Sequence, residues 1–154
     1  MSFYNKTILK LIDNNISIAI AESCTGGLIS SYFTKIPGIS KIFKMGLIVY
    51  SNESKKTLLK IPLRTIKKYG AVSNEISSLM LKNLYKISKC KICLSTTGIA
   101  GPAGGFKNKP VGLVYIGIKY GNKILIKKKI FSGKREEIQM KTLKYTLKIL
   151  KDLI

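Results

Sequence analysis

Short apolar runs alternate along this chain with segments whose apolar residues recur at helical spacing. The runs at 16–21, 46–51 and 92–98 are typical of buried strands, and the pair 111–120 and 123–131 is typical of a hairpin around Gly121 and Asn122. Helical patterns cover 3–13, 28–36, 52–59, a short stretch from Pro62, a longer one capped by Ser73, and 135–152. This alternation predicts a single α/β domain over residues 1–154, with a mixed parallel/antiparallel sheet flanked by helices.

Three polar turns follow the first three predicted strands. AESCTGG (21–27) comes after the first strand, Tyr50-Ser51-Asn52 closes the second, and Thr97-Gly98 opens a glycine-rich loop after the third. If these strands are parallel, the three turns meet at the carboxyl edge of the sheet, where open α/β sheets bind ligands. A site at that edge is therefore expected to use all three turns.

The AESCTGG turn carries two neighbouring nucleophile candidates, Ser23 and Cys24. N–H groups at the start of the following helix could stabilise an oxyanion, and Gly26 and Gly27 would let a substrate approach the backbone closely. From this stretch alone, a capped turn that binds an anion or no ligand is the simpler interpretation. The stretch also does not choose between Ser23 and Cys24.

The chain contains no histidine, so a serine nucleophile would need a different base. Tyr50 and Lys55 lie on one turn, YSNESK, with Lys55 in the first turn of a helix that Asn52 is predicted to cap. The helix N-terminus and burial would both disfavour the ammonium form, and so lower the pKa of Lys55. The alternative is that Lys55 is one of many solvated lysines.

The net charge of +21 raises the question of a nucleic-acid partner. All basic residues except Arg64 and Arg135 are lysines, and they are scattered along the chain. Recognition of phosphates and base edges favours arginine, because its guanidinium group bonds in a bidentate way. A specific nucleic-acid partner is therefore disfavoured, although the charge should attract anionic metabolites.

The cysteine and hydropathy patterns bear on two questions, which are whether the chain can bind zinc and where in the cell it is expected. Cys90 and Cys93 form a CxxC, but without histidine or a second CxxC a zinc site lacks ligands, and Cys93 is expected in the core. No apolar run reaches the length of a membrane span, and the N-terminal residues do not have the pattern of a signal peptide. The expected location is the cytoplasm, with no membrane partner.

Five segments taken together are more specific than any one of them. In order, AESCTGG, GLIVYSNESK, KYGAVSNEI, TGIAGPAGG with KPVGLVYIG, and FSGKRE resemble the C-terminal domain family of CinA proteins. Within that family they look most like the stand-alone nicotinamide-nucleotide amidases of the PncC type. The resemblance covers essentially the whole chain. Only about 20 residues precede the first motif, so the N-terminal domain of full-length CinA proteins is expected to be absent.

The resemblance implies an activity. The family's amidases hydrolyse the carboxamide of nicotinamide mononucleotide to nicotinic acid mononucleotide and ammonia, which serves pyridine nucleotide salvage. The implied partner is a small-molecule nucleotide substrate, and the resemblance implies no metal and no organic cofactor. The family's Ser–Lys–Tyr chemistry corresponds here to Ser23 as nucleophile, Lys55 as base, and Tyr50 as the group that orients Lys55 or relays its proton.

The resemblance also implies substrate contacts. N–H groups around Thr25 and Gly26, next to Gly27, would hold the oxyanion. The loop over 98–105 and a side chain after the hairpin would hold ribose and phosphate, through Thr97, Gly98, Gly101 and Arg135. One position departs from the family pattern, since Lys134 stands where an acidic residue commonly follows FSG. This difference reverses the charge next to Arg135, where the phosphate of the substrate is expected to bind.

Two other functions stay open. One is a non-catalytic nucleotide-binding or interaction domain of the same family, and the other is a basic nucleic-acid-associated protein. The intact set of Ser23, Tyr50 and Lys55 favours the enzyme over the binding domain. A nucleic-acid-associated protein would be expected to have clustered arginines, or aromatic residues interleaved with basic ones, and neither pattern is clear in this sequence. A homo-oligomer is compatible with the family resemblance, but the sequence names no interface.

Overall fold

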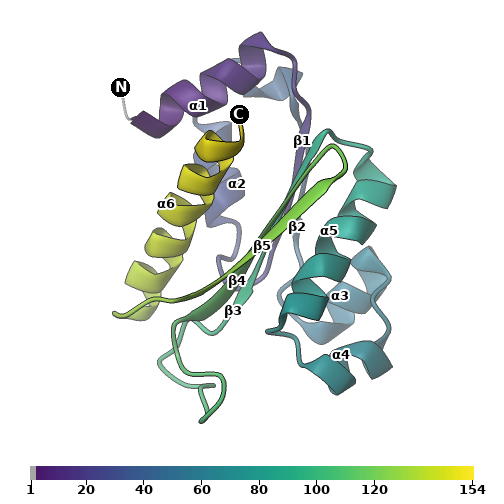
Figure 1. The fold of residues 1–154 in the computed structure, drawn as a ribbon, viewed down its shortest axis with the longest axis vertical. Helices are drawn as coiled ribbons and strands as arrows, with labels where there is room; N and C mark the ends of the chain where they lie inside the picture. Colours follow the sequence, from purple (N-terminus) through teal and green to yellow (C-terminus); the bar gives the residue numbers. More distant parts are fainter. Residues whose placement is uncertain (1–2) are drawn as a thin grey trace.

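A computed structural model describes residues 3–154, which fold into three layers with one five-stranded sheet in the middle (Figure 1). In chain order the elements are α1 (Phe3–Asp13), β1 (Ile18–Glu22), α2 (Leu28–Thr34), the 3-10 helix η1 (Ile39–Lys41), β2 (Phe43–Ile48), α3 (Asn52–Leu59), α4 (Leu63–Tyr69), α5 (Asn74–Ser88), β3 (Ile92–Gly98), β4 (Leu113–Tyr120), β5 (Lys123–Ile130) and α6 (Arg135–Leu153).

The sheet is mixed, as the sequence predicts. Its strand order is β2-β1-β3-β4-β5, with β1 parallel to both β2 and β3. β4 is antiparallel to β3 and β5 is antiparallel to β4, so the last two strands form the predicted hairpin. The prediction of one α/β domain with a mixed parallel/antiparallel sheet is confirmed. The carboxyl ends of β1, β2 and β3 therefore lie at one edge, which is the edge predicted to hold the three polar turns.

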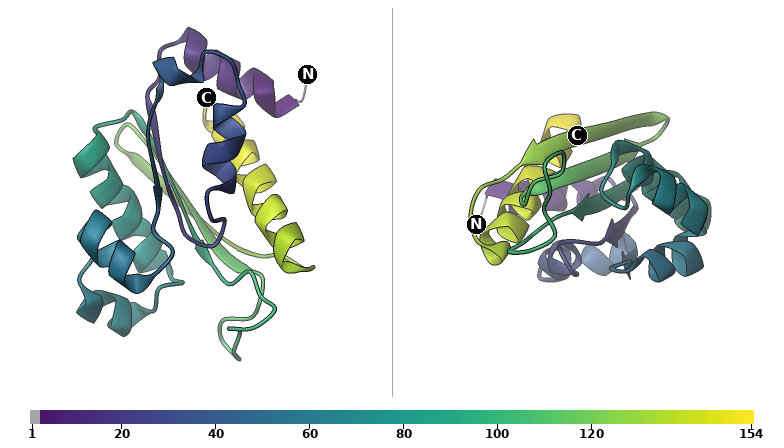
Figure 2. Two further views of the ribbon diagram at one scale, coloured as in Figure 1. Left: turned by 180° about the vertical axis from the view of Figure 1, so that it is seen from behind. Right: turned by 90° about the horizontal axis from the view of Figure 1, so that it is seen from below.

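The two faces of the sheet are covered by different sets of helices. Helices α1, α2 and α6 lie on one face, and α3, α4 and α5 lie on the other (Figures 1 and 2). The alternation within β1 serves both layers, because Ile18 and Ile20 join the core under the first set, whereas Ala19 and Ala21 join the core under the second. Every residue of β1 is buried, which explains why this strand is an unbroken apolar run until Glu22.

The second strand is placed differently from its prediction. The sequence pattern predicted a strand at 46–51, but β2 runs from Phe43 to Ile48, and Tyr50 lies in the connection to α3. β2 is an edge strand in which partly buried and exposed residues alternate, and its second residue, Lys44, is exposed to solvent. A search for continuous apolar residues therefore misses the start of this strand and extends it past its end.

The helix caps were predicted in part. Ser73 caps α5 as expected, because its Oγ accepts the N–H of Ile76 at 3.2 Å. The prediction that Asn52 caps α3 is wrong, since Ser51 is the cap and accepts the N–H of Ser54 at 3.0 Å, while Asn52 is the first helical residue. Within residues 3–154, no helix is long and apolar enough to cross a membrane.

Candidate active site

Ser23 is the first residue after β1 and begins the turn that leads to α2. Its N–H donates to the carbonyl of Thr96 at 3.0 Å, which extends the pairing of β1 with β3 by one residue and fixes the position of Ser23. The residue is only 7% exposed, yet it lines a pocket at the carboxyl edge of the sheet. Ser23 is therefore held rigidly with its side chain accessible from one side.

Lys55 lies directly behind Ser23. It projects from the first turn of α3, is 1% exposed, and donates from Nζ to Ser23 Oγ at 3.0 Å and to the carbonyl of Val49 at 2.8 Å. Burial removes the ammonium from water and lowers its pKa from 10.5 to about 8. The sequence interpretation of Lys55 as a buried lysine with a lowered pKa thus agrees with its surroundings, and the solvated alternative does not.

Gly26 and Gly27 shape the turn that follows Ser23. Both have positive φ, 59° and 99°, and Leu28 donates its N–H to the carbonyl of Thr25 at 3.0 Å, so residues 25–28 form a turn with two left-handed central residues. Glycine is the residue that adopts this geometry without strain. Neither glycine lines the pocket. Their role in the structure is conformational, rather than the close approach of a substrate expected from the sequence.

The N–H groups of both glycines in this turn already have acceptors within the protein. Gly26 donates to the carbonyl of Ser23 at 3.0 Å, and Gly27 donates to the carboxylate of Glu22 at 3.1 Å. Within residues 3–154, no other residue accepts the N–H of Cys24 or of Thr25. The N–H groups of Cys24, which lines the pocket, and of Thr25, which does not, are therefore the two in this turn that no other described residue accepts.

Glu22 is a buried carboxylate that sequence reasoning missed. It is fully buried at the end of β1 and accepts the N–H groups of Gly27, Ile29 and Ser30 and the hydroxyl of Ser30, at 2.7 to 3.1 Å. A buried carboxylate is tolerated when it is hydrogen-bonded in this way, and here it satisfies the unpaired N–H groups at the start of α2. Glu22 thus anchors the far side of the turn that carries Ser23.

We expect Glu22→Gln to lower the free energy of unfolding by about 2 kcal/mol, because the new amide would point an N–H at backbone donors that need an acceptor. Denaturant unfolding monitored by circular dichroism measures this change. The matched control is Glu53→Gln, which alters an exposed acidic residue in the first turn of α3 and should cost less than about 0.5 kcal/mol. Equal stabilities of the two variants would contradict the anchoring role.

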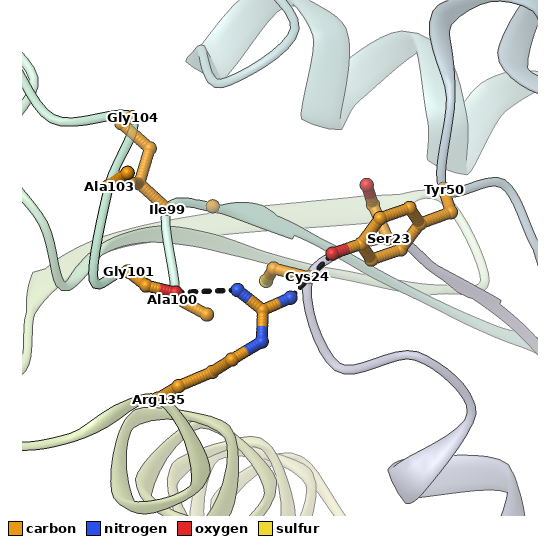
Figure 3. Close-up of a pocket in the computed structure, with 10 residues that line it drawn as sticks. Ser23, Cys24, Tyr50, Ile99, Ala100, Gly101, Ala103, Gly104 and Arg135 are labelled. Carbon is orange, nitrogen blue, oxygen red and sulfur yellow. Dashed lines mark hydrogen bonds between the residues drawn. The ribbon is translucent and has the colours of Figure 1, made fainter.

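The pocket in front of Ser23 has a volume of about 270 Å³ (Figure 3). Its lining comes from four segments, which are the Ser23 turn, the connection after β2, the end of β3 with the loop that follows it, and the start of α6: Ser23, Cys24, Tyr50, Gly98, Ile99, Ala100, Gly101, Ala103, Gly104 and Arg135. Its one charged side chain is a cation, Arg135, so the pocket suits an anionic ligand.

Arg135 spans the pocket. Its guanidinium donates to the carbonyl of Gly101 at 2.6 Å and to the hydroxyl of Tyr50, and so joins the loop after β3 to the connection after β2 (Figure 3). Tyr50 is 57% exposed, and within residues 3–154 no hydrogen bond joins its hydroxyl to Lys55. The structure therefore places Tyr50 on the pocket wall beside Arg135, and the predicted contact with Lys55 is not made in this conformation.

Cys24 is a neighbour of the nucleophile candidate with different properties. Its thiol is buried, and burial raises the pKa of the thiol to about 12. The thiolate is the nucleophilic form of cysteine, so this thiol is poorly suited to attack. The backbone carbonyl of Cys24 accepts the side-chain amide of Gln139 at 2.9 Å, a contact from α6 that sequence reasoning also missed.

The structure brings some of the predicted site residues together and leaves others apart. Of the predicted substrate-binding residues, Gly98, Gly101 and Arg135 line the pocket, whereas Thr25 and Thr97 are buried and do not line it. Thr25 Oγ1 shares a hydrogen bond with Thr96 Oγ1 at 2.8 Å, and Thr97 Oγ1 donates to the carbonyl of Ala71 at 2.8 Å.

Two further predicted features lie apart from the pocket. Lys134 is the exposed N-cap residue of α6 and does not line it. Cys90 and Cys93 are both buried free thiols, which agrees with the expectation that Cys93 lies in the core. Residues 3–154 contain no cluster of three or more His, Cys, Asp or Glu side chains able to hold a metal ion.

Comparison with known families gives a match along almost the entire chain. Residues 2–154 match the model of the CinA C-terminal domain. The chain is 42% identical over 147 residues to a protein of Thermoanaerobacter pseudethanolicus and 48% identical over 132 residues to one of Clostridium novyi, both provisionally named competence-damage inducible proteins. These alignments cover 95% and 86% of this chain but 36% and 32% of the relatives, so the chain spans about a third of the length of these curated relatives.

Solved structures give the same answer for the fold. The competence/damage inducible protein CihA from Agrobacterium tumefaciens is similar with a TM-score of 0.91 and 32% identity, and the alignment covers 99% of both chains. The competence damage-inducible protein A from Klebsiella pneumoniae has a TM-score of 0.91 at 24% identity, covering 98% of this chain and 96% of that one. At that identity, the second likeness concerns the fold alone.

Proposed function

The chain belongs to the CinA C-terminal domain family, and because it also contains the buried, hydrogen-bonded pair of Ser23 and Lys55, we propose that it is an amidohydrolase. Its proposed substrate is nicotinamide mononucleotide, and the products are nicotinic acid mononucleotide and ammonia. The observation that carries the proposal is the 3.0 Å contact between Lys55 Nζ and Ser23 Oγ at the wall of a pocket with a cationic side chain. Nucleophile and base must lie within hydrogen-bond reach of one another for this chemistry.

Lys55 acts as the base in the first step. With a pKa of about 8, roughly a tenth of the Lys55 side chains are neutral at pH 7, and the neutral amine accepts the Ser23 hydroxyl proton. Ser23 Oγ then bonds to the carboxamide carbon, and the electron pair of the C=O bond moves to its oxygen. Protonated Lys55 returns its proton to the amide nitrogen, so ammonia leaves as the tetrahedral intermediate collapses.

Water completes the cycle. Neutral Lys55 takes a proton from a water molecule, whose oxygen attacks the acyl carbon. As the bond between this carbon and Ser23 Oγ breaks, protonated Lys55 returns the proton to Ser23 Oγ, which releases the carboxylic acid and restores the Ser23 hydroxyl and the neutral amine. In both halves the negative oxygen needs donors, and the free N–H groups of Cys24 and Thr25 are the available ones in the Ser23 turn. This choice differs from the sequence expectation, which included Gly26, because the Gly26 N–H is already bonded to the Ser23 carbonyl.

Arg135 is the proposed anchor for the ribose phosphate. It is the cation among the pocket-lining residues, and it projects from the start of α6 toward the glycine-rich loop. A guanidinium group can hold a phosphate through two parallel hydrogen bonds. The loop backbone at Gly98 and Gly101 lines the space beside it. Tyr50, whose hydroxyl accepts from Arg135, lines the pocket at the connection after β2.

The test is ammonia release from nicotinamide mononucleotide, measured beside free nicotinamide at the same concentration. We expect turnover of the nucleotide and at least about tenfold lower kcat/KM for the free base, because the phosphate contact is lost. Ammonia from neither compound, with nicotinamide mononucleotide still bound in calorimetry, would overturn the amidase in favour of the non-catalytic nucleotide-binding domain.

The activity should depend on pH with a definite sign. Below a pH of about 8, Lys55 is mostly protonated and cannot accept the Ser23 proton, whereas above this value it is mostly neutral. We therefore expect kcat/KM to rise from about pH 6, with a midpoint near pH 8, and to level off above about pH 9. A steady-state profile measures this, with Lys56→Met, an exposed neighbour, as the control that keeps the same midpoint. A profile that is flat over that range would contradict the assignment of Lys55 as the base.

A further inference from the structure

Gln139 is the α6 side chain that bonds the backbone of the turn carrying Ser23. Its Nε2 donates to the carbonyl of Cys24 at 2.9 Å, across 115 positions of sequence. The other contacts of the turn come from Thr96 of β3, from Glu22 of β1 and from the side chain of Lys55 of α3. Gln139 is half-buried and lies one helical turn after Arg135, so the first two turns of α6 reach both the pocket and the turn.

The carbonyl that Gln139 holds belongs to the same peptide unit as the N–H of Thr25. In a trans peptide the C=O and the N–H point in opposite directions, and the Cys24–Thr25 bond is trans. Fixing the Cys24 carbonyl toward α6 therefore fixes the Thr25 N–H away from α6. We propose that Gln139 is a positioning residue for the oxyanion site, because it sets the orientation of the Thr25 N–H. This inference rests on the proposed amidase function.

The geometry of the turn explains why this peptide needs to be held. Gly26 donates its N–H to the Ser23 carbonyl, so residues 23–26 form a β-turn whose central peptide is Cys24–Thr25. The two common β-turn types differ by a rotation of that central peptide through nearly half a turn. The rotated form requires positive φ at Thr25, which is not observed and which a β-branched residue disfavours. Thr25 thus opposes a full rotation, and Gln139 opposes the smaller tilts that weaken a hydrogen bond.

Three variants of one side chain separate the donor from the packing. Gln139→Met keeps the length without a donor, Gln139→Glu keeps the shape but faces the carbonyl with an acceptor, and Gln139→Lys keeps a donor. We expect kcat for nicotinamide mononucleotide to fall about tenfold in the first two variants while KM changes less than about threefold, since the loss concerns the transition state. Gln139→Lys should stay within about threefold of the wild-type kcat.

A compound that mimics the tetrahedral intermediate distinguishes a specific effect on the oxyanion site from a general loosening of the pocket. In pyridine-3-boronic acid, boron accepts the Ser23 oxygen, Lys55 takes the proton, and the tetrahedral boronate presents an oxygen to the oxyanion site. We expect Gln139→Met to weaken boronate binding about tenfold while binding of nicotinic acid mononucleotide stays within about threefold, both measured by calorimetry. The matched control is Lys141→Met, which removes a different α6 side-chain bond, to the carbonyl of Ser132, and should change neither value.

The outcomes distinguish this inference from the proposed function. A wild-type protein that binds the boronate but releases no ammonia would overturn the substrate assignment, and the boronate measurements would still decide the role of Gln139. Wild-type kcat and boronate affinity in Gln139→Met would overturn the positioning role. Equal losses of boronate and product binding would also overturn it, because they would indicate a loosened pocket. A wild-type protein that binds no boronate would contradict both.

Discussion

Replacing Ser23 with alanine is expected to abolish ammonia release from nicotinamide mononucleotide, with kcat lower by about 10⁴-fold or more. In the proposed mechanism the Ser23 hydroxyl oxygen is the atom that bonds to the carboxamide carbon, so the variant lacks the reacting atom. Lys55 would remain buried and would still reach the Val49 carbonyl. We expect Ser23→Ala to bind the nucleotide with an affinity close to wild type, because Arg135 and the loop after β3 are untouched.

Cys24→Ala is the matched control, since it removes the other nucleophile candidate from the same turn. Burial raises the pKa of the Cys24 thiol to about 12, so almost none of it is thiolate near pH 7. We expect this variant to retain kcat within about tenfold, with a small loss of stability from the cavity left by the sulfur. Rate measurements on both variants in one assay decide the matter. An equal loss of turnover in the two would contradict Ser23 as the nucleophile.

Much of the fold was predictable because hydrophobic periodicity reports burial directly. β3 begins at Ile92 and ends at Gly98 where the apolar run predicted it, since its residues are buried almost throughout. β2 was misplaced because it lies at the sheet edge and has solvent on one side. The pattern of a strand buried on both faces is therefore easier to locate than that of an edge strand, whose polar positions interrupt the apolar run.

The positions of candidate site residues were predictable where one local stretch contained them. AESCTGG and YSNESK supplied Ser23 and Lys55, and parallel strands brought them to one edge, where their side chains lie 3.0 Å apart. Glu22 could have been noticed, because a carboxylate at the end of a buried strand requires donors, and the N-terminus of α2 follows it. Gln139 had no such signal. Its contact depends on how α6 packs against the Ser23 turn, which periodicity does not specify.

The residue types at the site fit a chain without histidine. A lysine in water is protonated near neutral pH and cannot serve as a base, so a lysine base depends on burial. The fold provides this burial, because Lys55 points from the exposed start of α3 into the space behind Ser23, next to the buried end of β1. The lowered pKa and the position are therefore two results of the same packing.

Replacing Lys55 with methionine should lower kcat at least about a hundredfold, the contribution expected of a positioned base. Methionine has a similar length and no charge, so it can fill the buried space, although the carbonyl of Val49 loses its donor. Because the free-energy cost of burying an ammonium group also disappears, we expect the melting temperature to shift by only a few degrees. The loss of activity should thus occur in a folded protein, measured by ammonia release and by calorimetry on the same sample.

Two further measurements make the Lys55 prediction specific. Lys56→Met removes the neighbouring exposed lysine and should leave kcat unchanged, which excludes a general effect of net charge. The residual activity of Lys55→Met should also lose the rise between about pH 6 and about pH 8, because the group that titrates there is gone. If Lys55→Met keeps wild-type turnover, or keeps that rise in a folded protein, the proton of Ser23 is taken by another group and the Ser–Lys mechanism is wrong.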